Sequence, residues 1–397
     1  MSTSPVSPTA PTAQPPLPVV LAGARGHGRW HLENIRRLQS LGLVTLAGVC
    51  ELNPLSEEEL DGFGSPQQAA DFGALLDSTG AAIAVVCTPI PTHTDLALAA
   101  AERGVHVLLE KPPAPSYAEF RRMADGVRAA GVHCQIGFQS LGSKALDAIR
   151  ELIAAGTIGE VLGIGGAGAW VRDEAYFRRA PWAGRRRIGD TDVVDGVLTN
   201  PLAHAVATAL ALDGSSRAED IDSIEAELFR ANDIEADDTS CVRITTRRGT
   251  PVVISVTLCA DQPDDPYLLI HGTSGRITFW YKDDRILVQR AGQGPEESVH
   301  GRTDLLENLL AHLAGSAELL VPPDATGAFM RVVETVRTAP EPTPIPASAW
   351  SETEDTDGVR RRTVQGIDGL VAAGADTLTL FSELGVPWAL PSEVHSS

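Results

Sequence analysis

Short apolar runs alternate with stretches of helical spacing through the first 140 residues. The runs occupy residues 18–22, 44–50, 81–87, 105–109 and 132–137. Apolar side chains recur at helical spacing over residues 29–38, 92–104 and 116–131. Short runs that are apolar on both faces are typical of strands buried within a parallel sheet. The alternation therefore predicts a doubly wound α/β domain over residues 18–140.

The second half of the chain has a different pattern, in which strands follow one another directly. An amphipathic helix is predicted over residues 143–155. Strand-like runs follow at residues 161–170, 223–230, 239–246, 252–258, 267–271, 276–281 and 285–289. Successive strands without intervening helices pair antiparallel. Residues 141–338 are therefore predicted to form an α+β domain with an open, mostly antiparallel sheet.

Both ends of the chain depart from these patterns. Residues 1–17 are rich in Pro, Ser, Thr and Ala and carry no Lys or Arg. This composition predicts a disordered tail rather than a secretory signal. Residues 339–358 are rich in Pro and acids and are predicted to be a loop, followed by a helical stretch over residues 359–384. We expect residues 339–397 to pack as an extension over the active-site mouth or on the domain surface.

Composition narrows the class of partner. The chain has 52 acidic and 32 basic residues, with a formal net charge of −20. Nucleic acids and anionic membranes bind basic surfaces, and no apolar run approaches the ~18 residues of a membrane span, so neither partner is expected. The five cysteines are scattered without a CxxC pair. This predicts reduced thiols in a cytoplasmic protein and no metal site.

The turn after the first strand carries a glycine motif. Gly23, Gly26 and Gly28 lie between that strand and the first helix, and Arg25 stands where the usual motif has its middle glycine. Glycine is needed where the backbone turns tightly and approaches a pyrophosphate, so the turn predicts a Rossmann dinucleotide site. Glu51 ends the second strand and is expected to bind the adenosine ribose. Because no arginine follows it closely, NAD is predicted over NADP.

The run over residues 105–109 ends in Glu110, Lys111 and Pro112. Pro112 restricts Lys111 to extended geometry, so the lysine is expected at the carboxyl edge of the sheet, where open α/β sheets bind ligands. Another strand ends at Thr88-Pro89, shortly before His93. A solvated charge at a strand end is the alternative interpretation of Lys111.

Together these motifs resemble the Gfo/Idh/MocA family of oxidoreductases, which includes glucose-fructose oxidoreductase and inositol dehydrogenase. The resemblance covers residues 18–330 and is most specific at Glu110-Lys111-Pro112. It implies that Lys111 reaches the reacting hydroxyl, that helices cover one face of the second sheet, and that sheets of different subunits pair into a dimer or tetramer. The residues expected around the cofactor are Gly23, Arg25, Gly26, Gly28, Glu51, Thr88, Pro89, His93, Glu110 and Lys111.

Asn200 begins a second candidate element, in which Pro201 follows and His204 lies four residues later. Asn is a favoured N-cap and Pro a favoured first helical residue, so a helix is predicted to begin here. The family has an acid where Asn200 stands, so Asn200 is either a site residue or only a cap. The helix N-terminus favours a neutral imidazole at His204, as a general base requires. A core histidine is the alternative.

Residues 171–188 form a loop of unusual composition, with six arginines, two acids and interleaved aromatic residues. Aromatic faces bind sugar rings and guanidinium groups bind anions bidentately. The candidate substrate-binding residues are Trp170, Arg172, Tyr176, Trp182 and Asn200. The alternative is a loop held by salt bridges or buried at a subunit interface. For Arg185, Arg186 and Arg187, an anionic substrate is preferred over acidic protein surface as the countercharge.

These elements predict an NAD(P)-dependent dehydrogenase or reductase that acts on a secondary hydroxyl of a sugar, glycoside or cyclitol. His204 would remove the hydroxyl proton while Lys111 stabilises the developing alkoxide beside Asn200. Two rivals remain open: redox-neutral glycoside cleavage through transient oxidation, and a non-catalytic NAD-binding sensor. Asn200 and the altered glycine motif favour the sensor, whereas the presence of both Lys111 and His204 favours an enzyme.

Overall fold

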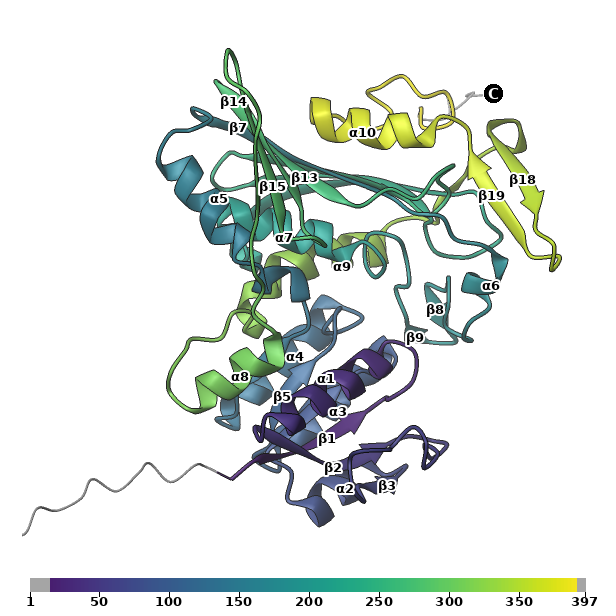
Figure 1. The fold of residues 1–397 in the computed structure, drawn as a ribbon. Helices are drawn as coiled ribbons and strands as arrows, with labels where there is room; N and C mark the ends of the chain where they lie inside the picture. The colour runs from purple at the N-terminus through teal and green to yellow at the C-terminus, as the bar shows by residue number, and fades with distance from the viewer. Residues whose placement is uncertain (1–14, 391–397) are drawn as a thin grey trace, which may run out of the picture.

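A six-stranded parallel sheet forms the N-terminal part of the protein (Figure 1). The computed structural model describes residues 15–390, so residues 1–14 of the expected tail, and residues 391–397, lie outside it. Leu17 already belongs to a strand. In sheet order the strands are β3 (Gln67–Ala69), β2 (Val44–Cys50), β1 (Leu17–Ala22), β4 (Ile83–Val86), β5 (His106–Leu109) and β6 (Cys134–Ile136).

The strand order reverses between β1 and β4, which confirms the doubly wound topology. Ligands of such sheets bind beyond the carboxyl ends of the strands at this reversal. The connecting helices are α1 (Gly28–Ser40), α2 (Phe72–Thr79), α3 (His93–Ala101) and α4 (Tyr117–Ala129). The side chain of Ser116 caps α4 by accepting from the Glu119 amide, whereas the hydroxyl of Thr92 donates to the Pro89 carbonyl and caps no amide of α3.

A nine-stranded, mostly antiparallel sheet forms the second part of the molecule, as predicted. Only the β7–β12 and β10–β17 pairs are parallel among its strands. In sheet order the strands are β16 (Glu296–Val299), β15 (Arg285–Arg290), β14 (Gly275–Trp280), β13 (Tyr267–Gly272), β7 (Val161–Ala169), β12 (Pro251–Thr257), β11 (Thr239–Thr246), β10 (Ile221–Arg230) and β17 (Thr343–Pro344).

One face of this sheet carries α5 (Ala145–Ala154), α7 (Ala203–Asp213) and α9 (Gly327–Thr338) (Figure 1). The helix α8 (Leu305–Leu313) returns to the N-terminal sheet and packs on β5 and β6. Buried Gln135 of β6 donates to Asn308 of α8 and accepts from the Val321 amide at 2.8 Å. These packing contacts and hydrogen bonds therefore hold the two parts of the molecule together, in addition to the chain connection at residue 140.

The opposite face of the second sheet is covered by α10 (Ile367–Thr377), which the expectation of helices on one face did not include (Figure 1). A Cβ at Gly165 of β7 would lie 1.9 Å from the Ala375 carbonyl oxygen, so only glycine permits this close approach. Phe381 and Val371 complete a second hydrophobic core between sheet and extension.

The prediction of a helix over residues 359–384 is wrong for the first residues of that range, which form a strand. Arg360–Val364 forms β19 and pairs antiparallel with β18 (Trp350–Glu354), within the segment expected to be a loop. Gly366, with a φ of 70°, separates this hairpin from α10. The hairpin forms because Arg362 covers the ring of Trp350 at 4.4 Å and pairs with Glu352 at 3.0 Å, contacts that helical periodicity does not reveal.

Gly165→Ala should destabilise the protein by about 1–3 kcal/mol, because the added methyl forces the backbone of α10 away from the sheet. Gly369→Ala, within α10, is the matched control, since a Cβ there meets nothing within 4 Å. It should leave stability unchanged or raise it by up to ~1 kcal/mol through helix propensity. Chemical denaturation measures both; equal stabilities for the two variants would contradict the close packing of α10.

Candidate active site

The glycine turn after β1 is built as a dinucleotide site requires. Gly23 has a φ of 80°, and a Cβ there would lie 2.4 Å from the Cys87 carbonyl oxygen. A Cβ at Gly28 would lie 1.9 Å from the Gly23 carbonyl oxygen, and Gly26 has a φ of 57°. The turn ends at the N-terminus of α1, whose amide groups attract a pyrophosphate. The residues present therefore fit a dinucleotide.

Glu51 and Arg25 lie at the expected ribose end of this turn. The Glu51 carboxylate accepts from the Ala24 amide at 2.6 Å, which fixes it beside the glycine turn. The Arg25 guanidinium pairs with Glu59 at 3.1 Å and donates to the carbonyls of Asn53 and Pro54. The expectation that no arginine lies near the end of β2 is therefore wrong, because the turn brings Arg25 back over residues that follow Glu51.

Thr88, Pro89 and His93 form the loop after β4, next to the glycine turn. The Thr88 and Thr92 hydroxyls are 2.7 Å apart. His93 is buried, and its ring nitrogens lie 2.9 Å from the Pro112 carbonyl and 2.8 Å from the Thr88 carbonyl. Both ring nitrogens of His93 therefore contact backbone carbonyls, one in this loop and one in the Lys111-Pro112 segment.

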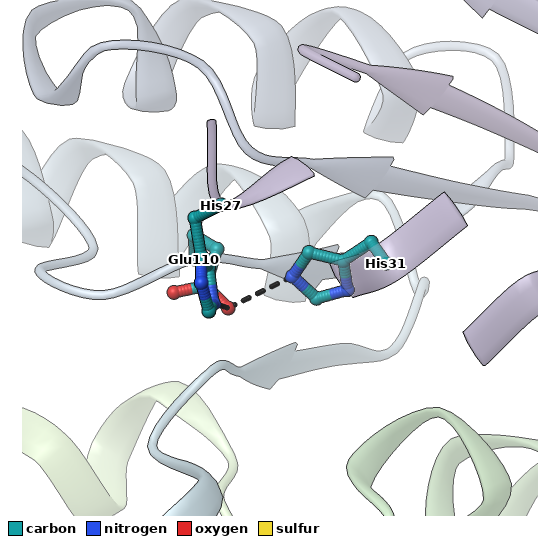
Figure 2. A group of neighbouring side chains, drawn as sticks. All are labelled: His27, His31 and Glu110. Carbon is teal, nitrogen blue, oxygen red and sulfur yellow. Dashed lines mark hydrogen bonds and ion pairs between the residues drawn. The ribbon is translucent and has the colours of Figure 1, made fainter. Parts of the chain in front are cut away.

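Glu110 lies beneath the glycine turn and faces two histidines of that region (Figure 2). Its Oε1 lies 2.9 Å from His31 Nε2 and 3.6 Å from His27 Nε2, and its Oε2 accepts from the Lys111 amide at 3.1 Å. Burial raises the pKa of Glu110, but its interactions with His27 and His31 outweigh this and hold the pKa well below its usual range. Glu110 is thus a buried, ionised carboxylate.

Lys111 meets Asn200 directly. Its ammonium donates to the Asn200 side-chain oxygen at 2.8 Å and to the Asn200 carbonyl at 2.9 Å. Asn200 is not a cap: α7 begins at Ala203, and Leu202 is its N-cap residue without a side-chain bond. The prediction of a helix beginning at Pro201 is wrong because residues 197–202 form a turn, which places the Asn200 amide group between Lys111 and an acid.

That acid is Asp195, which sequence reasoning missed. Its Oδ1 accepts from the Asn200 side-chain amide at 2.6 Å, and its Oδ2 lies 3.2 Å from Arg179 and accepts from the Gly184 amide at 2.8 Å. Asp195 is buried, and desolvation raises its pKa. Val194 before it has a φ of 52°, a strained conformation for a β-branched residue that marks functional sites. An acid five residues before Asn200 was the available signal.

His204 lies on the first turn of α7 beside this chain of contacts. Its Nδ1 lies 3.1 Å from the Ser140 hydroxyl, which also accepts from Thr208 at 2.8 Å. Burial, and next the positive charge of Lys111, lower the pKa of His204 to about 3. The imidazole is therefore neutral at physiological pH. When its Nδ1–H donates to Ser140, the other nitrogen is available as a base.

The candidate substrate loop is a stack of alternating aromatic and guanidinium groups. Arg172 lies over the rings of Trp170 and Tyr176, at 4.8 and 4.9 Å from their centroids. Arg179 lies over Tyr176 at 3.8 Å and over Trp182 at 4.6 Å. Since Arg179 also pairs with Asp195, the stack is joined to Asn200 and Lys111. Arginines of the same chain cover aromatic faces that were expected to bind a sugar.

The side chains of Arg185, Arg186 and Arg187 all have partners within the chain, which are acids for Arg185 and Arg187 and backbone carbonyls for Arg186. Arg185 pairs with Glu235 and Arg187 with Asp192, while Arg186 donates to carbonyls of residues 336–340. The preference for an anionic substrate at these three arginines is therefore wrong. Arg185 and Arg186 anchor the loop through partners far away in sequence, whereas the partner of Arg187 lies five residues further along the chain.

Comparison with known proteins identifies the family. A model described as "Oxidoreductase family, NAD-binding Rossmann fold" matches residues 17–138, and one described as "GFO/IDH/MocA C-terminal domain" matches residues 146–278. The chain belongs to the Gfo/Idh/MocA family of oxidoreductases. It therefore has an NAD-binding Rossmann domain, as predicted.

Similar Gfo/Idh/MocA proteins include levoglucosan dehydrogenase of Pseudarthrobacter phenanthrenivorans, 23% identical over 59% of this chain and 64% of that protein. The scyllo-inositol 2-dehydrogenase (NAD(+)) of Bacillus subtilis is 31% identical over 28% of this chain and 34% of that protein. Both matches thus span less than two thirds of the relative. The WlbA dehydrogenase structure from Bordetella pertussis, in complex with NADH and UDP-GlcNAcA, covers 81% of this chain and 95% of its own, with 21% identity and a TM-score of 0.67.

The solved WlbA dehydrogenase structure therefore agrees in fold with this Gfo/Idh/MocA chain. No helix within residues 15–390 has both the length and the apolar character needed to cross a membrane.

Asn200→Asp should destabilise this Gfo/Idh/MocA protein by about 1–3 kcal/mol, because the new carboxylate would face Asp195 where an amide now donates. Exchanging the two groups, Asp195→Asn with Asn200→Asp, should recover most of the loss, since one carboxylate and one amide are again paired. Thermal denaturation of the single and double variants tests this. A fully stable Asn200→Asp variant would show that the two side chains do not meet.

Proposed function

We propose that this protein transfers a hydride between NAD(H) and the carbon of a secondary hydroxyl or ketone in a sugar, glycoside or cyclitol. One arrangement carries the proposal: the Lys111 ammonium, held by Asn200 at the carboxyl edge of the sheet, lies beside a neutral His204. Membership of an oxidoreductase family and similarity to proteins named levoglucosan and inositol dehydrogenases support it.

In oxidation, His204 takes the hydroxyl proton and Lys111 donates a hydrogen bond to the same oxygen as its negative charge develops. Such a positioned donor stabilises charge most in the transition state. The bound nicotinamide supplies the hydride acceptor. His204 is a weak base when Lys111 is charged and no substrate is present. A hydroxyl that binds Lys111 becomes more acidic, which favours proton transfer to His204.

Asn200 and Asp195 act as positioning residues in this proposal. Asn200 aims the Lys111 ammonium, and Asp195 supplies the nearby negative charge that an acid at position 200 would otherwise supply. Arg172 is the substrate-facing candidate of the loop, because it makes no ion pair among residues 15–390 and is held by Trp170, Tyr176 and the Val171 carbonyl. Its remaining N–H groups are suited to hydroxyl or carboxylate groups of a substrate.

A cytoplasmic location and a homo-oligomer are also part of the proposal. Five free cysteines are consistent with a reducing compartment. Since α10 lies over the centre of the outer sheet face, subunits would meet through the parts of that face that α10 leaves uncovered, where Val299 of β16 is exposed. Multi-angle light scattering should give a mass of two or four chains; a monomer would refute this part.

Incubation with NAD and a panel of sugars, glycosides and cyclitols should produce NADH, read by its absorbance, in equal amount to ketone product. Redox-neutral glycoside cleavage would instead release a sugar without net NADH, and a sensor would bind NAD without turnover. Either result would refute hydride transfer as the net reaction.

Lys111→Met and His204→Gln should each lower kcat by at least about 10²-fold, as expected for loss of a positioned catalytic group. Affinity for NADH should change little, because neither side chain bonds the glycine turn. Arg187→Met, which loses only its pair with Asp192 on the loop, serves as the folded control and should keep a near-normal kcat. Near-normal turnover of either site variant would remove that residue from the mechanism.

NADH should bind more tightly than NADPH, because the Glu51 carboxylate repels a 2′-phosphate. Glu51→Ser should narrow the difference by at least about tenfold, as measured by fluorescence titration with both cofactors. Arg25→Met is the matched control and should leave the preference unchanged, because Glu59 already pairs with this guanidinium. Tighter NADPH binding that Arg25→Met abolishes would make Arg25 the determinant instead.

A further inference from the structure

We propose that His27, His31 and Glu110 form a binding site for one divalent transition metal ion, such as Zn²⁺ or Co²⁺. The site lies beside the glycine turn, and Glu110 directly precedes Lys111 in the chain (Figure 2). The prediction of no metal site was based only on the absence of a CxxC pair of cysteines. Glu110 is moreover 79 residues away from His31 along the chain.

The two histidines have the spacing of a helical metal pair. His27 has helical backbone angles and directly precedes α1, and His31 lies four residues later in the same helix. Residues four apart lie on one face of a helix, so the two imidazoles point the same way without any rearrangement of the backbone. Glu110 comes to them from the end of β5, which completes a set of two imidazoles and one carboxylate (Figure 2).

The distances suit a metal ion. At metal–ligand distances of ~2.0–2.1 Å, tetrahedral ligand atoms lie about 3.3 Å apart. Here Glu110 Oε1 lies 2.9 Å from His31 Nε2 and 3.6 Å from His27 Nε2, and all three ligand atoms lie within 4.8 Å of one another. Reaching a separation of about 3.3 Å requires a change of at most about 1.5 Å in any of these distances, and His27 is exposed on the side where it would move.

Glu110 is prepared as an anionic ligand. It is buried, and the Lys111 amide donates to its second oxygen, which leaves Oε1 facing the two imidazoles. A Cβ at Gly137 would lie 2.6 Å from Oε1, so this glycine leaves room for the carboxylate where any larger residue would displace it. A divalent ion with two neutral imidazoles and one carboxylate leaves a net positive charge, which suits the entrance to a pyrophosphate site.

The proposed metal site has an open coordination position and is expected to bind the ion with moderate affinity. Three protein ligands leave a fourth position for water or another oxygen ligand, on the side where His27 is exposed. The Nδ1 of His31 is buried and has no hydrogen-bond partner among the described residues. Metal-bound histidines usually donate this N–H to an acceptor, and its loss typically costs about 10–100-fold in affinity. We therefore expect reversible binding, removable by a chelator.

The test is a titration of the chelator-treated full chain with Zn²⁺ by calorimetry, and with Co²⁺ by visible absorption. One ion should bind per chain, and Co²⁺ should show the intense bands of a four-coordinate site. His27→Ala should weaken binding at least about tenfold and, because His27 is exposed, should leave the far-ultraviolet circular dichroism unchanged. Glu110→Gln should have a similar effect on metal affinity.

His133→Ala is the matched control. His133 is also exposed and lies in another histidine cluster, 3.0 Å from His312 and stacked on His106. The affinity of this variant for metal should equal that of the unaltered protein. Absence of saturable binding, unchanged affinity in His27→Ala, or loss of binding in His133→Ala would each overturn the proposal. None of these outcomes bears on hydride transfer, because the readout is metal binding alone.

Discussion

The ammonium group of Lys111 lies between the end of β5 and the turn before α7, and the site is organised around its need for acceptors and countercharge. Burial lowers the pKa of Lys111, while Glu110 and Asp195 oppose that effect. Asn200 supplies two oxygens, Asp195 holds the Asn200 amide, and Arg179 in turn pairs with Asp195. A partly buried charge without such partners would cost roughly several kcal/mol. The chain of contacts therefore fixes the turn before α7 against the end of β5.

The same arrangement determines the state of His204. Burial and a positive Lys111 keep the imidazole neutral, and α7 positions it beside the ammonium. The surroundings of Lys111 and His204, rather than the ordinary pKa values of the two side chains, therefore determine which group donates a hydrogen bond and which acts as the base. Strain at Val194 is part of the cost of placing Asp195 where it can serve this site.

The sequence predicted most of the strands and the first sheet's topology, because buried parallel strands and antiparallel runs have strong hydrophobic patterns. It also singled out Lys111, Asn200 and His204 as candidates, from their places at a strand end and a predicted helix start, and the structure brings these three residues together. It did not identify Asp195, Arg179 or the partners of Arg185 and Arg186. Those contacts form only in the folded chain, and no regular spacing along the sequence indicates them. The Asn-Pro cap and the helix at residues 359–366 failed because tertiary contacts of Asn200 and Arg362 outweigh local propensity.

The central claim is that Lys111 and Asp195 are energetically coupled through Asn200, and a double-mutant cycle tests it most directly. The free energy of unfolding is measured for Lys111→Met, Asp195→Asn and the double variant. Lys111→Met leaves Asp195 with Arg179 as its remaining cationic partner, and Asp195→Asn leaves Lys111 with Glu110 as its remaining acid. Each single change thus removes one countercharge of the other group, so the double variant should be more stable than the sum of the two single effects predicts, by about 1–3 kcal/mol. Additive effects, within about 0.5 kcal/mol, would contradict the account.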